Sequence, residues 1–183
     1  MKKKNVRQPT LSGEILELRP ISVAYVSRSY VAWLNDPKVN QYLESRFTRS
    51  TIAGVRKYVK NILKDKDIYF FAIIAQDGAH IGNIKLGPID QHHKLAAIGL
   101  MIGDKQYWGR GYATEAIRLI THFAFKNLKL HKVTAGTYTN NLGSIKAFLK
   151  EGFYQEGVER KHYRYGKDYV DGVLMAKISS SGR

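Results

Sequence analysis

A glycine-rich turn between an apolar run and an amphipathic segment limits what this chain can fold into. The apolar run covers residues 95 to 102 and is typical of a buried strand. The turn lies within Gln-Tyr-Trp-Gly-Arg-Gly-Tyr-Ala-Thr-Glu-Ala at 106 to 116, and apolar residues then recur at helical spacing, at 113, 116, 117, 120 and 124. The pattern predicts a strand, a tight turn and a long helix in direct succession.

The beginning of such a helix is suited to bind a phosphate or pyrophosphate group. Its first backbone N–H groups have no partner within the helix, and the helix dipole is positive at this end. Gly109 and Gly111 would let the main chain approach an anion, because glycine has no Cβ. The turn is neither a kinase-type P-loop nor a dinucleotide fingerprint, since it lacks Gly-Lys-Ser/Thr and the third glycine. A pair of glycines that only caps the helix is the alternative.

The composition excludes several classes of protein. The 183 residues are enough for one domain with its own core. No apolar run is long enough to cross a membrane, and the basic residues 1 to 5 are not followed by the apolar stretch of a secretory signal. The chain has no cysteine, which excludes disulfides, zinc–thiolate sites and thiol nucleophiles. These features lead us to expect a cytoplasmic protein.

The charge is strongly positive. Lys and Arg number 30 against 15 Asp and Glu, a formal net charge of +15. Such a balance favours an anionic partner, either nucleic acid, a nucleotide-linked metabolite or coenzyme A, although a solvated basic surface also accounts for it. No recognition helix, zinc finger or RNA-binding sheet signature is present, so nucleic-acid binding has no specific support.

The periodicity predicts one domain at residues 13 to 178, between a basic tail at 1 to 12 and a polar tail at 179 to 183. Predicted strands cover 14–19, 67–75, 80–86, 95–102, 132–138, 157–165 and 170–177. Predicted helices cover 23–34, 51–64, 111–128 and 144–150. The order indicates an α+β fold, a mixed sheet of about seven strands flanked by helices.

A second motif follows the fifth predicted strand. Asn141 and Ser144 open the next helix in an Asn-x-x-Ser pattern, and Gly152-Phe153 closes it. Together with Gln-x-x-Gly-x-Gly at 106 to 111, this order resembles the GNAT acyltransferases, which are acetyl-CoA-dependent N-acetyltransferases. The resemblance covers roughly residues 14 to 177, and its distinctive part is 98 to 153. Within the superfamily the chain looks most like the branch of ribosomal-protein N-terminal, spermidine and amino-sugar acetyltransferases.

The resemblance implies a particular cofactor site. The fourth and fifth predicted strands would splay apart, and the pantetheine arm of acetyl-CoA would enter the gap and bond the open edge of the fourth strand as an added strand does. Gly136 would leave room for this arm, although close packing explains it equally well. Asn141 is also a candidate helix cap. The implied cofactor contacts are Leu100, Met101, Ile102, Gln106, Tyr107, Trp108, Gly109, Arg110, Gly111, Tyr112, Ala113, Thr114, Asn141 and Ser144.

The implied reaction is direct attack of an amine on the thioester in a ternary complex. The main-chain N–H of Met101 or Ile102 would polarise the carbonyl. In many family members a Tyr four residues after the motif Ser protonates the thiolate, but Phe148 occupies that position here, so this role cannot be transferred. Tyr138 and Tyr154 are candidate replacements, with packing of a half-buried aromatic ring as the alternative for each.

The sequence also offers candidates for the base and the acceptor contacts. Glu44 lies in a connector that by resemblance lines the acceptor cleft, although a lone Glu on a loop is usually solvated. Strand alternation places Asn83 and Lys85 on one face and His80 on the other, and the polar face would contact acceptor or solvent. Asp171 would face the acceptor or hold a turn. The neighbouring histidines at 92 and 93 lack further ligands, so we expect no metal site.

The sequence therefore predicts an enzyme that moves the acetyl group of acetyl-CoA to a primary amine. The acceptor would be a small-molecule amine, such as a nucleotide-linked amino sugar, or a protein N-terminus. The density of positive charge disfavours a polyamine. The alternative is a non-catalytic module of the same fold that binds RNA or another anionic partner. No membrane association is expected, and both a monomer and a homodimer are compatible with the sequence.

Overall fold

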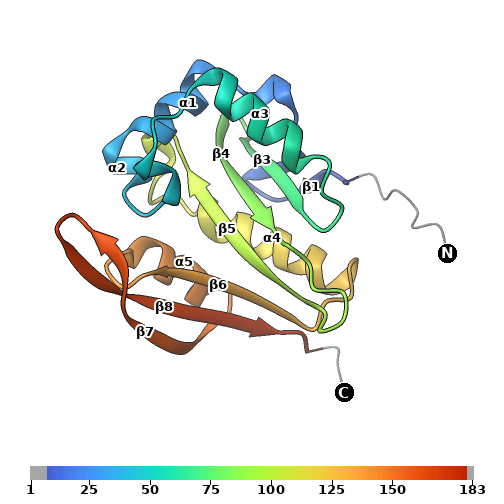
Figure 1. The fold of residues 1–183 in the computed structure, drawn as a ribbon. Coiled ribbons are helices and arrows are strands. Elements are labelled where there is room, and N and C mark those ends of the chain that lie inside the picture. Colours follow the sequence, from blue (N-terminus) through green and yellow to red (C-terminus); the bar gives the residue numbers. More distant parts are fainter. Residues whose placement is uncertain (1–7, 181–183) are drawn as a thin grey trace.

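A computed structural model describes residues 8–180, which form one mixed sheet with helices on both faces (Figure 1). The strand order is β1-β2-β3-β4-β5-β6-β8-β7. The strands are β1 (Leu11–Ser12), β2 (Leu16–Pro20), β3 (Tyr69–Ala75), β4 (His80–Leu86), β5 (Leu95–Ile102), β6 (Lys132–Tyr138), β7 (Tyr154–Tyr165) and β8 (Asp168–Ile178). The predicted α+β class is confirmed, with eight strands in place of about seven.

Five α-helices and three short 3-10 helices accompany the sheet. They are η1 (Val23–Tyr25), α1 (Arg28–Asn35), α2 (Pro37–Asn40), η2 (Glu44–Phe47), α3 (Ile52–Ile62), η3 (Lys105–Tyr107), α4 (Tyr112–Lys126) and α5 (Leu142–Lys150). Within residues 8–180, no helix is both long and apolar enough to cross a membrane.

Two hydrophobic cores lie on opposite faces of the sheet, because the central strands are apolar on both sides. In β3, Phe71 and Ile73 point into a core shared with α4 and α5, whereas Phe70, Ala72 and Ile74 point into a core shared with α1 and α3. This period of two explains why β3 is a continuous apolar run. Figure 1 shows the same layering, with α1 and α3 on one side of the sheet and α4 on the other.

The sheet divides between β5 and β6, the fourth and fifth strands of the sequence prediction. The two strands are parallel, and only Leu95 to Ala97 of β5 pair with β6. The rest of β5 pairs only with β4, and β6 continues alongside β8. Figure 1 shows the two strands diverging. The predicted splay is therefore present, and it exposes one edge of β5.

The start of the chain differs from the predicted basic tail. Leu11–Ser12 forms β1, which pairs with β2 and supplies the extra strand. The side chain of Gln8 also binds the edge of β3, donating to the Ile68 carbonyl (3.2 Å) and accepting from the Phe70 N–H (3.3 Å). The structure differs from the predicted tail at Leu11–Ser12, because a two-residue strand is too short to show a periodicity in the sequence. Residues 1–7 of the predicted tail, like residues 181–183 of the polar tail, lie outside the described residues.

The predicted helix at 23–34 is broken into η1 and α1. Ser27 lies between them with an extended backbone, and its hydroxyl caps α1 by accepting from the Tyr30 N–H (3.1 Å). Pro37 begins α2 at a position where proline needs no N–H donor. Thr51 caps α3, and its hydroxyl accepts from the Gly54 N–H (3.1 Å).

The predicted alternation along β4 is confirmed from Asn83 to Leu86 but is wrong for His80 and Ile81. Ile81 packs in the same core as Ile84, on the α4 side of the sheet. His80 and Asn83 lie together on the opposite side, with His80 Nε2 3.1 Å from Asn83 Oδ1. A register shift between Ile73 and Ile74 of β3 accompanies the change of face. Such a bulge redirects side chains in a way that a period of two cannot predict.

Candidate functional site

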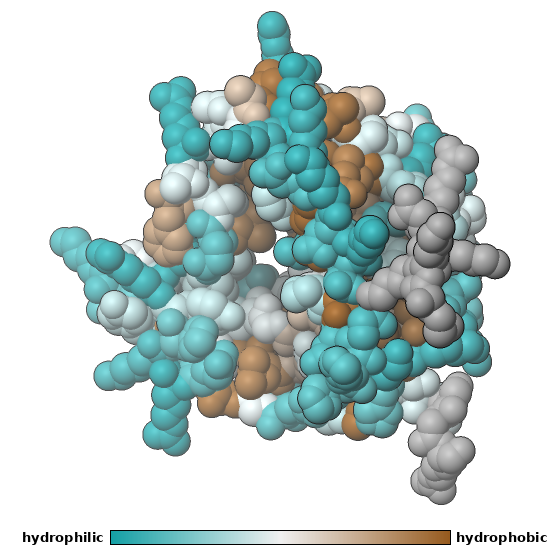
Figure 2. All heavy atoms as spheres, turned by 45° about the vertical axis from the view of Figure 1, so that its right-hand side comes forward, coloured by the Kyte–Doolittle hydropathy of each residue, from teal (hydrophilic) through white to brown (hydrophobic). Residues whose placement is uncertain are grey.

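A cleft of about 930 Å³ lies where β5 and β6 diverge. Its walls are the two separated strands, the start of α4, the first part of α5 and the connector from α2 to η2. One face of the molecule is visibly hollowed near its centre, with hydrophilic side chains around much of the hollow (Figure 2). The glycine-rich turn therefore opens into a space large enough for an extended ligand.

The turn before α4 presents unpaired amides to this cleft. Gly109 (φ 73°) and Gly111 (φ 87°) both adopt the left-handed conformation, which disfavours other residues. The first backbone hydrogen bond of α4 joins the Glu115 N–H to the Gly111 carbonyl (3.0 Å), so the three preceding N–H groups have no partner within the helix. A Cβ added to Gly109 would meet no atom within 4 Å. The backbone angle, not packing within the protein, thus requires this glycine.

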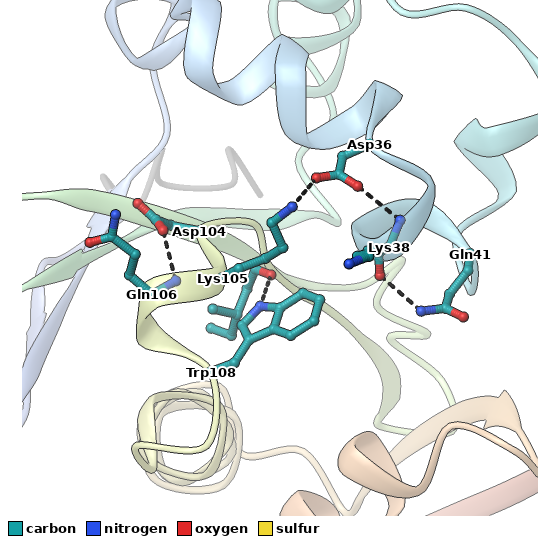
Figure 3. Close-up of polar contacts among 8 residues, drawn as sticks. Asp36, Lys38, Gln41, Asp104, Lys105, Gln106 and Trp108 are labelled. Atoms are coloured by element: carbon teal, nitrogen blue, oxygen red, sulfur yellow. Dashed lines mark hydrogen bonds and ion pairs between the residues drawn. The ribbon is translucent and has the colours of Figure 1, made fainter.

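Side chains of the turn bond to three other segments and hold the turn in place, and Figure 3 shows the contacts of Trp108 and Lys105. The Trp108 indole N–H donates to the Ile102 carbonyl (2.8 Å), which ties the turn to the end of β5. Lys105 Nζ lies 2.5 Å from Asp36 Oδ2 at the corner between α1 and α2, and this ion pair lowers the pKa of Asp36. The Tyr107 hydroxyl donates to Asp77 (2.6 Å), which raises the pKa of Tyr107 to about 12. The turn is therefore fixed without a ligand.

Glu115, in the first turn of α4, has a structural role that the sequence reasoning missed. Its buried carboxylate accepts from the N–H groups of Glu14 (2.7 Å) and Ile15 (2.8 Å) and from Arg118 (2.7 Å). Burial alone would raise its pKa, but the two backbone donors and Arg118 together lower it. An acidic residue in the first turn of a helix was the available signal. Its actual partners lie about 100 residues away in the sequence and could not be predicted from it.

Most of the predicted cofactor residues line the cleft. They are Leu100, Met101, Ile102, Tyr107, Trp108, Gly109, Gly111, Tyr112, Ala113, Thr114, Asn141 and Ser144. Gln106 and Arg110 are exceptions, since both are exposed and neither is among the lining residues. In Figure 3 the Gln106 side chain points away from Trp108, while its backbone N–H is bound to Asp104 (3.0 Å). The 3-10 turn η3 directs this side chain outward, so its position does not support the predicted contact.

Asn141 caps α5, the alternative that the sequence left open. Its Oδ1 accepts from the Ser144 N–H (3.3 Å), and its Nδ2 donates to Thr137 Oγ1 (3.1 Å) on β6. Asn141 and Ser144 still line the cleft, as does Phe148, which packs against Phe153 with ring centroids 4.9 Å apart. The Asn-x-x-Ser motif thus fixes the start of α5 against the strand that forms one wall.

A second cavity, of about 550 Å³, lies on the α1 and α3 side of β4 and β5. Asn83 lies in its lining, while Glu44, Lys85 and Met101 line both this cavity and the cleft. The other residues that line both spaces are Leu43, Tyr58, Gly99 and Leu100. The two spaces therefore meet at the exposed part of β5, with Glu44 at their junction.

Glu44 and Tyr138, predicted separately, lie in contact. The buried Tyr138 hydroxyl donates to Glu44 Oε1 (3.1 Å). The Tyr138 ring stacks on Tyr163 with centroids 4.0 Å apart, and the Arg46 guanidinium lies 5.0 Å from its centre. Burial raises the pKa of Tyr138, Arg46 opposes this shift, and Glu44 reinforces it. The Tyr138 phenol is therefore held neutral as a donor.

The sequence reasoning also missed Tyr163, which lines the cleft from β7. Its hydroxyl lies beside Gly136, 3.5 Å from the point that a Cβ on this glycine would occupy. Among the described residues, this hydroxyl has no hydrogen-bond partner. Burial raises its pKa, and the nearby carboxylates of Glu159 and Glu44 raise it further. Tyrosines at alternate positions of the last hairpin were the only signal, and they also suit an exposed strand.

The tip of this hairpin is fastened to the α2–η2 connector. Tyr165 donates to Gln41 Oε1 (3.0 Å), and Arg46 donates to the carbonyls of Gln41 and Arg164. Nearby, Tyr42 donates to the Asn140 carbonyl (3.2 Å). These bonds connect segments about 100 residues apart and hold Glu44 over the cleft.

Two further predicted residues, Asp171 and Tyr154, line neither cavity. Asp171 accepts from the Lys161 N–H (2.7 Å) through its carboxylate, and its carbonyl accepts from Thr139. It holds the β7–β8 hairpin, which was the alternative to acceptor binding. Tyr154 is exposed and donates to Glu156 (3.4 Å), so its position does not favour the role of a proton donor.

Comparison with known proteins agrees with this arrangement. The family model described as an acetyltransferase (GNAT) domain matches residues 16–154. The probable N-acetyltransferase YjcK of Bacillus subtilis is 36% identical over 134 residues, which are 70% of this chain and 74% of YjcK.

Two solved structures share the fold. Spermidine N-acetyltransferase of Vibrio cholerae, in complex with CoA and spermine, has a TM-score of 0.82 and 20% identity, covering 92% of this chain and 98% of its own. The ribosomal L7/L12 α-N-protein acetyltransferase RimL, also in complex with CoA, has a TM-score of 0.82 and 18% identity. The match covers 95% of this chain and 100% of the RimL chain. The family match spans well over half of the sequence, and this chain therefore belongs to the GNAT family of acetyl-CoA-dependent N-acetyltransferases.

Proposed function

We propose that this enzyme acetylates a primary amine carried on an oxygen-rich molecule, either a nucleotide-linked amino sugar or a protein N-terminus. The observation that carries the proposal is the meeting of two cavities at Glu44 and β5. One cavity offers free backbone amides to a diphosphate, and the other is lined by polar and apolar side chains. Acetyl-CoA and the acceptor amine would thus approach the same part of β5 from opposite sides.

The cofactor would occupy the cleft between β5 and β6. Its diphosphate would bind the amides that follow Gly109 and Gly111, where the helix dipole of α4 also attracts negative charge. Its pantetheine arm would run along the edge of β5 that β6 leaves unpaired. The thioester would then lie near Met101, whose main-chain N–H, or that of Ile102, would stabilise the developing oxyanion.

Glu44 is the proposed base. Its carboxylate lies at the junction of the two spaces, where it would take the proton of the incoming ammonium directly or through water. Tyr138 would hold Glu44 through the 3.1 Å hydrogen bond. The neighbouring Tyr163, with its free hydroxyl and raised pKa, would supply a proton to the leaving thiolate in place of the tyrosine that Phe148 replaces.

The charges around the second cavity support an acceptor that is not a polyamine. Its lining residues include one carboxylate, Glu44, and two cations, Arg49 and Lys85. A polyamine carries several ammonium groups and needs a matching number of carboxylates, whereas phosphate or carbonyl oxygens suit Arg and Lys. The net charge of +15 also disfavours a polyamine, because it repels a polycation over longer distances.

The test combines calorimetry with acetyl-CoA and a thiol-release assay on amino sugars, N-terminal peptides and polyamines. We expect Gly109→Asp to weaken acetyl-CoA binding at least about tenfold, because it places a charge and a strained residue beside the diphosphate. Gly166→Asp is the matched control, since Gly166 also has a positive φ (64°) and open space around it but lines neither cavity. Equal losses in both variants, or no binding by the wild type, would contradict the proposal.

A further inference from the structure

Two buried polar atoms on the walls of the second cavity have no hydrogen-bond partner among the described residues. They are Asn83 Nδ2 and Ser45 Oγ, and both residues line the 550 Å³ space. Asn83 is only 4% exposed. Native structures satisfy nearly all buried donors, so these two groups need a partner, either a bound water or a ligand.

The other end of the Asn83 amide is held by His80. Asn83 Oδ1 lies 3.1 Å from His80 Nε2. The imidazole is enclosed by Tyr25, Tyr30 and Trp33, with ring centroids at 5.2, 5.8 and 5.2 Å. Burial lowers the pKa of His80, which keeps the ring neutral. With its proton on Nε2, His80 donates to Oδ1, and Nδ2 is then the end of the amide without a partner.

The position of Asn83 relative to β5 places this donor near the reaction. Asn83 is opposite Met101 in the β4–β5 ladder. Opposed residues of an antiparallel pair have Cβ atoms about 5 Å apart on one face of the sheet. Since Met101 is where the thioester would lie, an amine that attacks it from the second cavity would bring its neighbouring atoms toward Asn83. Glu44 lines the same cavity.

We propose that Asn83 determines acceptor specificity by donating a hydrogen bond from Nδ2 to an oxygen close to the reacting amine, and that His80 positions it. This inference rests on the proposed function and narrows its substrate class. A sugar hydroxyl and a peptide carbonyl present the same accepting oxygen. A simple alkylamine or polyamine has none, so it leaves Nδ2 buried and unpaired, and a site built to bond an oxygen rejects such a molecule. Ser45 Oγ offers a second, weaker contact.

The experiment uses two matched pairs of amines in the thiol-release assay with the full chain. One pair is glucosamine and cyclohexylamine, and the other is trialanine amide and its analogue with the first carbonyl reduced to methylene. We expect the oxygen-bearing member of one pair to have a kcat/KM at least about tenfold above its partner, the discrimination that one buried hydrogen bond gives. The pair that shows the preference identifies the source of the oxygen.

Three variants separate recognition from folding. Asn83→Leu removes the donor and should bring the tenfold ratio close to one. Asn83→Asp keeps an oxygen for His80 but replaces the donor with an acceptor, so it should reverse the preference toward the oxygen-free amine of the pair. His80→Phe keeps a ring in the aromatic enclosure and should reduce the ratio while activity on the oxygen-free amine is retained.

Asn40→Leu is the matched control. Asn40 is also buried, but its Nδ2 already donates to the Leu34 carbonyl (2.8 Å), and it lines neither cavity. This variant should lower the melting temperature and leave the kcat/KM ratio unchanged. A ratio that falls equally in Asn40→Leu and Asn83→Leu would show that folding, not recognition, causes the loss.

A second measurement needs no turnover. The side-chain amide resonance of Asn83, assigned by its absence in Asn83→Leu, should shift saturably with the preferred oxygen-bearing amine and not with its partner. If acetyl-CoA binds but the ratios stay near one and the resonance does not move, Asn83 has no such role, although the proposed function stands. If acetyl-CoA neither binds nor is consumed, the proposed function fails, and an unmoved resonance then overturns the Asn83 inference separately.

Discussion

The cofactor cleft and the acceptor cavity meet at β5 but are built in different ways. The cofactor side uses backbone groups from one continuous stretch, with free amides after Gly109 and Gly111 and an open strand edge at Leu100 to Ile102. The acceptor side uses side chains from separate segments, among them Glu44, Asn83 and Lys85. A backbone site needs only glycine and local order, so it keeps a recognisable sequence. A side-chain site depends on which segments the fold brings together.

The most severe test of this comparison is Glu44→Gln. If catalysis and cofactor binding are separable, kcat/KM should fall about 10²- to 10⁴-fold, the usual contribution of a general base. Calorimetry should show acetyl-CoA binding within about twofold of the wild type, because Glu44 is not part of the diphosphate turn. A parallel loss of acetyl-CoA affinity would mean that the two regions are not independent.

Glu115→Ala should disturb the cofactor side through stability. The substitution leaves the Glu14 and Ile15 N–H groups without their acceptor, at about 1–3 kcal/mol each. Denaturant unfolding should therefore show a loss of about 2–6 kcal/mol. A loss under about 0.5 kcal/mol would show that water replaces the carboxylate at no cost.

The same residue predicts a pH dependence. Because the folded state lowers the pKa of Glu115, its contribution is complete above the ordinary value of 4.5 and is lost as pH falls through the lower folded-state pKa. Wild-type stability should decline through this acid range, and Glu115→Gln should show a shallower decline. Identical pH profiles in the two proteins would exclude Glu115 as the cause.

Tyr163→Phe tests a smaller effect at the boundary between the two regions. The variant keeps the ring that stacks on Tyr138 and removes only the hydroxyl. We expect kcat to fall about tenfold with little change in stability, as for the loss of a proton donor where water partly substitutes. Tyr154→Phe serves as the control, since its hydroxyl lies outside the cleft. Equal kcat values for both variants and the wild type would remove Tyr163 from the mechanism.

The smallest effect is expected from Ser45→Ala. Ser45 Oγ is buried without a partner, so its removal costs no existing hydrogen bond and should leave the melting temperature unchanged. If an acceptor oxygen completes its bond, KM for the oxygen-bearing amine should rise about two- to fivefold, while acetyl-CoA binding is constant. An unchanged KM would restrict acceptor recognition to Asn83.

Sequence reasoning succeeded where structure is local. The strand, turn and helix around residues 95–126 were predicted closely, and Asn141 and Thr51 are caps as their residue types suggest. It failed where a distant segment changes the local outcome. The β4 alternation is broken by a shift opposite Ile73, and β1 exists only because β2 is available to pair with it.

The same distinction between local and long-range structure applies to the candidate site. The cleft-lining amides could be predicted because positive φ values require glycine at fixed places. The contact between Glu44 and Tyr138, 94 positions apart, could not, and neither could the position of Tyr163 beside Gly136. For Asp171 the sequence left acceptor contact and a turn as alternatives, and in the fold its carboxylate accepts from the Lys161 N–H of the hairpin.

The sequence by itself determined the fold class, the family and the backbone elements that would hold a diphosphate, because hydrophobic period and glycine placement act within a few residues. Only the tertiary structure decided which side chains face the reacting centre. The divergence of β5 from β6, the fastening of the α2–η2 connector to the last hairpin and the unpaired amide of Asn83 each depend on contacts between distant segments. Packing and hydrogen bonding select these contacts among many that the same sequence pattern allows.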